Sequence, residues 1–163
     1  MTRSSQLWRA GVMAAFLFVS ASVVLDAKPV DPCSLLTPAE IQEALGKTVQ
    51  AGKLKTHASP AAGADCNFVV GDIGSFNVLV KPLAASETAA RIKAEFVKMK
   101  MNPVDLPNVG DSSFFTSPGY GMVQLHTLKG SSYFLFTILV PGVEEKALQS
   151  GAAKLMLKLL SKL

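Results

Sequence analysis

The sequence predicts an α+β fold: an antiparallel sheet of about six strands, with two long helices packed on one face and a short leading helix. Several short runs alternate apolar and polar residues, which is the pattern of half-buried strands. Two longer segments repeat apolar residues every three or four positions, which is typical of amphipathic helices. The elements follow one another in the order α-βββα-βββα, and such an order is satisfied by helices layered over an antiparallel sheet.

The beginning of the chain differs from the rest. Two arginines frame a polar start, and an uncharged apolar run of 16 residues follows at 10–25. These are the charged and hydrophobic regions of a secretory signal peptide, and the run is short for a membrane-spanning helix of about 20 residues. We therefore expect a signal peptide over 1–27, cleaved after Ala27 or alternatively after Ser22, and a single α+β domain over 28–163. An uncleaved membrane anchor is the alternative.

The best-marked element is a helix over Pro38–Leu45. Thr37 can cap its start, Pro38 stands at the first helical position, and Glu40 completes a T-x-x-E capping box. Gly46 follows as a typical helix end. Its few apolar positions predict a short helix that lies on something larger.

The chain has only two cysteines, Cys33 and Cys66. Cys33 stands too far behind the apolar segment to be a lipoprotein anchor, and it lies outside the first helical turn whose dipole would activate a catalytic thiol. An even pair on an exported chain favours a disulfide, with free thiols or a redox role as alternatives. A zinc site is disfavoured because the cysteines and the two histidines, His57 and His126, lack paired spacing.

The remaining elements are read from periodicity and turn residues. We expect strands at 47–55, 65–70, 75–81, 112–116, 121–128 and 132–140. A helix is expected from Ser86, its cap, to Met101, with an apolar stripe of Ala89, Ile92, Phe96 and Met99. A last helix is expected over 143–160, with Leu148, Ala152, Leu155, Met156 and Leu159 on one side. Leu135 and Leu139 point away from the predicted core and therefore mark spare apolar surface.

No pattern in the sequence indicates catalysis, a metal or a cofactor. His126 lies on a predicted strand without a serine or cysteine motif, so we interpret it as a structural or surface histidine. Lysines 154, 158 and 162 form a stripe on the last helix, which is interpreted as a solvated face or as a contact for anionic lipid or an acidic partner. The mature chain would keep 14 basic and 11 acidic side chains, without the basic cluster that nucleic-acid binding requires.

Several segments resemble a known family. The opening "DPCSLLTPAEIQEALG", a second cysteine in "CNF", and the later "VGDSSFF" and "LKGSSYFLFTILV" are similar to small secreted proteins and lipoproteins, common in actinobacteria, that are classed as a domain of unknown function. The resemblance implies that Cys33 pairs with Cys66, and it implies no catalytic residue. The chain lacks the anchor cysteine of the lipoprotein members.

Together these observations predict an exported, soluble, non-enzymatic domain, secreted or periplasmic, without a cofactor. We expect it to bind a protein, a peptide or a small apolar ligand through an open sheet face or a strand edge, and not nucleic acid. Two alternatives remain at this point: a small envelope hydrolase that uses His126, and an envelope protein that associates with the membrane surface.

Overall fold

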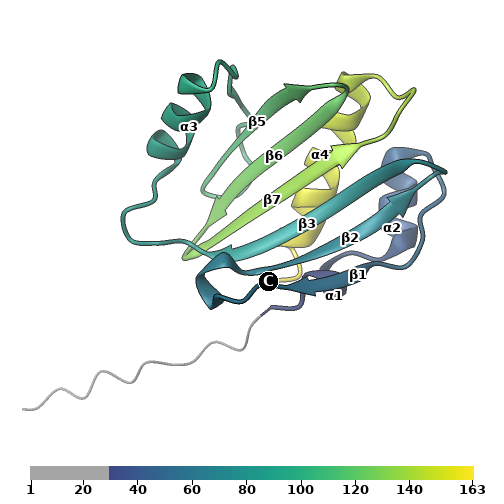
Figure 1. Cartoon of the computed structure of the whole chain (residues 1–163), viewed down its shortest axis with the longest axis horizontal. Helices are drawn as coiled ribbons and strands as arrows, with labels where there is room; N and C mark the ends of the chain where they lie inside the picture. The colour runs from purple at the N-terminus through teal and green to yellow at the C-terminus, as the bar shows by residue number, and fades with distance from the viewer. Residues whose placement is uncertain (1–29) are drawn as a thin grey trace, which may run out of the picture.

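The computed structural model describes residues 30–163, so the predicted signal peptide over 1–27 lies outside the described residues. The chain forms one antiparallel sheet of seven strands in the order β1-β2-β3-β7-β6-β5-β4 (Figure 1). The strands are β1 (Lys53–Thr56), β2 (Ala64–Val70), β3 (Gly74–Pro82), β4 (Val104–Asp105), β5 (Ser112–Gly119), β6 (Met122–Lys129) and β7 (Ser132–Leu139). The helices are α1 (Pro32–Leu35), α2 (Pro38–Leu45), the 3-10 turn η1 (Pro60–Ala62), α3 (Ala89–Lys98) and α4 (Glu145–Leu160). The predicted α+β class and antiparallel sheet are confirmed.

The core lies between the sheet and the pair α2 and α4, which stand behind the strands in Figure 1. Alternate residues of the central strands face these helices, and the buried aromatic residues on this side are Phe68, Phe76, Phe115, Phe134 and Phe136. The predicted apolar side of α4, namely Leu148, Ala152, Leu155, Met156 and Leu159, is buried against them. Each leucine, methionine or phenylalanine side chain in this layer contributes roughly 1.5–3 kcal/mol on burial, so the layer supplies most of the hydrophobic stabilisation.

The prediction that both long helices pack on one face is wrong for α3. The ring of Phe96 in α3 contacts the rings of Phe114 and His126, whereas the neighbouring strand residues Phe115 and Leu125 belong to the core shared with α4. Since successive strand residues point to opposite faces, α3 lies on the far side of the sheet, beside β5 in Figure 1. The helical period of α3 was visible in the sequence, but the face that it covers was not.

The second helix on the core face is the short α2. Gly151 of α4 allows the close approach, because a Cβ atom at that position would lie 2.7 Å from the carbonyl oxygen of Ala44. The structure also corrects the start of α3, which is capped by the Thr88 side chain rather than by Ser86: Thr88 accepts a hydrogen bond from the backbone N–H of Arg91. The additional strand is β4, which has only two residues and lies between Pro103 and Pro107, residues that favour turns in a sequence.

The predicted disulfide between Cys33 and Cys66 is present. It joins α1 to β2 with the two Cα atoms 5.1 Å apart, a normal separation for a disulfide. The chain passes close to this bond at Gly52, where an added Cβ atom would lie 2.3 Å from the Cys66 sulfur and 2.7 Å from the Phe68 ring. The strand expected over 47–55 is interrupted here: Val49 makes an isolated bridge, and the regular strand β1 begins at residue 53.

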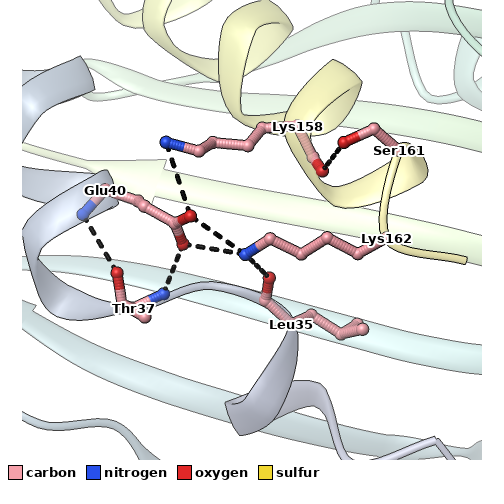
Figure 2. Close-up of polar contacts among 6 residues, drawn as sticks. All are labelled: Leu35, Thr37, Glu40, Lys158, Ser161 and Lys162. Atoms are coloured by element: carbon pink, nitrogen blue, oxygen red, sulfur yellow. Dashed lines mark hydrogen bonds and ion pairs between the residues drawn. The ribbon is translucent and has the colours of Figure 1, made fainter.

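A polar cluster fastens α2 to the end of α4 (Figure 2). Glu40 completes the predicted capping box, since its carboxylate accepts a hydrogen bond of 2.8 Å from the Thr37 backbone N–H. Lys162 donates to both Glu40 oxygens at 3.0 Å and to the Leu35 carbonyl at 2.8 Å, and Lys158 lies 3.4 Å from the carboxylate. The Thr37 N–H, followed by Lys162, lowers the pKa of Glu40 to about 2, so this carboxylate stays charged under ordinary conditions.

Candidate functional site

The face of the sheet opposite α2 and α4 is largely uncovered by the helices of the described region (Figure 1). We call it the open face and define it by its side chains on β2, β3, β7 and β6: Asp65, Asn67, Val69, Asn77, Leu79, Gln124, Leu135, Thr137 and Leu139. All are exposed or partly exposed, unlike the core residues that alternate with them. The open face confirms that Leu135 and Leu139 point away from the core.

Strand register sorts the open face into rows that run across the strands. One row is apolar at its centre, where Leu79 of β3 stands opposite Leu135 of β7. The adjacent row is polar: Asn77 stands opposite Thr137, and Thr137 opposite Gln124. Cross-strand neighbours of this kind lie about 5 Å apart. The open face therefore offers leucine side chains next to amide and hydroxyl groups on a continuous surface.

A hydrogen-bond chain links the polar row to the buried His126. Tyr133 Oη lies 2.6 Å from Nδ1 of His126, and Thr116 Oγ1 lies 2.9 Å from its Nε2. Thr116 in turn donates to Gln124 Oε1 at 3.2 Å, and Gln124 Nε2 donates to Thr137 Oγ1 at 3.5 Å. A neutral imidazole has one donor and one acceptor nitrogen. Both ring nitrogens of His126 are therefore bonded to hydroxyl groups, those of Tyr133 and Thr116.

His126 lies beneath α3 in an aromatic cluster. Its ring is stacked on Phe114, with centroids 4.6 Å apart and planes 8° apart, and it meets Phe96 at 4.6 Å. Burial lowers the pKa of His126 from 6.5 to about 4, and the side chain is 1% exposed. Neither ring nitrogen bonds a carboxylate. The structure therefore places His126 as a neutral packing residue, in agreement with the structural interpretation.

Two lysines cover the outside of this aromatic cluster. Lys81 lies over the Tyr133 ring at 5.2 Å and forms an ion pair of 2.7 Å with Glu87. Lys93 lies over the Phe114 ring at 5.4 Å and pairs with Asp105. Burial also raises the pKa of the Tyr133 hydroxyl above its usual range. Each lysine is thus held over the aromatic cluster while its charge is paired with a carboxylate.

A second histidine group, which the sequence did not reveal, lies at the β2 side of the open face. His57 Nε2 lies 2.6 Å from Asp65 Oδ1, and Asn77 Nδ2 donates to the other oxygen, Oδ2, at 2.9 Å. These residues come from the loop after β1, from β2 and from β3, so no sequence spacing indicates their meeting. The bond to the Asp65 carboxylate therefore fixes the orientation of the His57 ring.

Other candidate features are assigned as follows. Within residues 30–163, no group of three or more His, Cys, Asp or Glu side chains is arranged to hold a metal ion. Two members of the predicted lysine stripe, Lys158 and Lys162, are engaged with Glu40, so only Lys154 of the stripe lacks an ion pair in the described region. No helix of this region is both long and apolar enough to cross a membrane.

The comparisons with known proteins give no relative. No family model, no curated protein and no solved structure matches this chain. The resemblance to the secreted family of unknown function therefore stays a prediction.

Proposed function

We propose that this protein is an exported, non-enzymatic binding domain whose open face receives a segment of another protein. The observation that carries the proposal is the pairing of an apolar row, Leu79 and Leu135, with a polar row of amides and hydroxyls on one uncovered surface. An extended polypeptide has the matching chemistry, because its side chains can contact leucines while its backbone groups bond to Asn and Gln. A small apolar ligand is less well suited, since such ligands bind in concave sites that bury most of their surface.

The disulfide supports the exported location. A bond between Cys33 and Cys66 persists in oxidising compartments and is rare in the cytosol. It also fixes α1 to β2, one of the strands that carry the open face. The domain would therefore present the open face on a covalently braced sheet outside the cytosol.

A photo-crosslinking experiment tests the proposal. Benzoylphenylalanine is introduced at Leu135 or at Leu139 of the open face, and as a control at Leu157, which is 49% exposed on α4. In the cells that produce the protein, we expect a discrete adduct of higher mass from the two open-face positions and none from Leu157. A charge on the open face, Leu139→Lys, should abolish the Leu135 adduct, whereas Leu157→Lys should preserve it. Equal adducts at all three positions, or none, would refute the proposal.

A further inference from the structure

The edge strand β1 has features that the proposed function does not use. Among the strands of the described region it stands at the end of the sheet and pairs with β2 alone. All four of its residues are exposed, and Leu54 is 50% exposed. An edge strand directs half of its backbone N–H and C=O groups away from the sheet, where another strand can pair with them. The other edge, β4, has two residues and offers much less backbone.

The two faces of β1 differ in chemistry. Lys53 and Lys55 stand in register with Asn67 and Asp65, so they lie on the side of the open face. Leu54 stands in register with Cys66 and lies on the other side. A strand that paired with the free edge would place alternate side chains next to the lysines and the intervening one next to Leu54.

The charges of β1 are not balanced within the described part of the chain. Neither Lys53 nor Lys55 has a carboxylate within ion-pair distance there. The nearest carboxylate in register, that of Asp65, is already bonded by His57 and Asn77. At the β4 edge, by contrast, Asp105 is paired with Lys93. The edge at β1 is therefore a positively charged strand with free backbone groups.

We propose that β1 binds an extended acidic segment of a partner protein as an eighth strand, with the pattern acidic–apolar–acidic opposite Lys53, Leu54 and Lys55. A second copy of this chain does not fit, because antiparallel pairing of two β1 strands sets lysines against lysines, and like charges on cross-strand neighbours destabilise pairing. The inference rests on the proposed function, since the added strand would extend the open face and carry the partner onto it.

The test uses the oxidised protein and synthetic peptides. The probe is a nine-residue peptide of alternating glutamate and valine with a fluorescent label, and binding is followed by fluorescence anisotropy. We expect saturable binding that weakens as salt is raised, because salt screens exposed charges. The double variant Lys53→Glu, Lys55→Glu should weaken binding at least tenfold and should instead bind the matching lysine–valine peptide. The matched control, Lys146→Glu with Lys154→Glu on α4, should bind as the wild type does.

A second peptide separates strand addition from simple charge attraction. N-methylation of all backbone amides of the peptide removes the hydrogen-bond donors of both its edges and keeps the charges, so it should abolish binding if β1 adds a strand. Unchanged binding of the methylated peptide would overturn the inference. Absence of any binding by the unmodified peptide would also overturn the inference. The lysines would then be interpreted as residues that prevent pairing between sheet edges. Crosslinking at Leu135 tests the open face separately, so loss of the β1 result alone leaves the proposed function standing.

Discussion

Acidification should destabilise the fold through His126. In the folded chain burial lowers the pKa of this histidine to about 4, against 6.5 for an accessible histidine. The unfolded chain therefore takes up the proton more readily, and stability is full above about pH 6.5 and is lost as the pH falls toward 4. A shift of one pKa unit corresponds to about 1.4 kcal/mol, so the total loss is roughly 3 kcal/mol, of which about 2 kcal/mol falls between pH 7.5 and pH 5.

The assay is urea unfolding at pH 7.5 and pH 5, on the wild type and on His126→Gln. The variant has a lower free energy of unfolding at both pH values, because glutamine replaces a ring that stacks on Phe114. The informative quantity is the loss of unfolding free energy between pH 7.5 and pH 5, which should be about 2 kcal/mol larger in the wild type than in the variant. The carboxylates with lowered pKa, such as Glu40, contribute equally to both proteins and cancel.

One control accompanies this measurement. Phe96→Ala removes the ring by which α3 covers His126, so His126 gains access to water, its pKa rises, and the dependence becomes smaller. The reasoning is refuted if the wild type and His126→Gln lose the same free energy of unfolding between pH 7.5 and pH 5.

Three further predictions concern the scaffold. Replacing Cys33 by Ser and Cys66 by Ala should lower the free energy of unfolding by about 3–4 kcal/mol, which is the chain-entropy value for a loop closed over a separation of 33 residues. Urea unfolding without reductant measures this loss. A loss below about 1 kcal/mol would contradict the prediction. Gly52→Ala should lower the free energy of unfolding by about 1–3 kcal/mol, because the added Cβ atom would meet the Cys66 sulfur. The loss should be smaller in the cysteine-free variant. Equal losses in the two backgrounds would exclude this contact as the cause. Glu40→Ala should lower the free energy of unfolding by about 1–2 kcal/mol, because it removes half of the capping box. Hydrogen exchange in α2 should become faster. The control is Glu43→Ala, at an exposed position on the same helix, which should show neither effect.

Local signals explain which elements were predictable. The start of α2 follows from Thr37, Pro38 and Glu40, whose capping bonds are made between residues three positions apart. The hairpin of β2 and β3 likewise follows from alternating apolar residues around a short turn. The start of α3 was misplaced by two residues because Ser86 and Thr88 are both acceptable caps, and the choice between them depends on where the chain leaves β3.

The candidate sites were only partly predictable. Two cysteines on a chain with a predicted export signal admit one intramolecular pairing, so the bond between Cys33 and Cys66 could be predicted without coordinates. The group formed by His57, Asp65 and Asn77 could not, since its members lie eight and twelve residues apart on three separate segments. The surroundings of His126 were equally hidden, because Phe96 reaches it from a helix 30 positions earlier in the sequence.

By itself, the sequence determined the α+β class, the identity of most elements and the disulfide, because caps, turns and apolar periodicity act over a few residues, and two cysteines allow a single pair. Only the tertiary structure decided which face α3 covers, that the lysines of the edge strand β1 have no ion pair within residues 30–163, and that Leu79, Leu135 and the amide row form one surface. Those features depend on strand order and register, which are fixed by contacts between segments far apart in the chain.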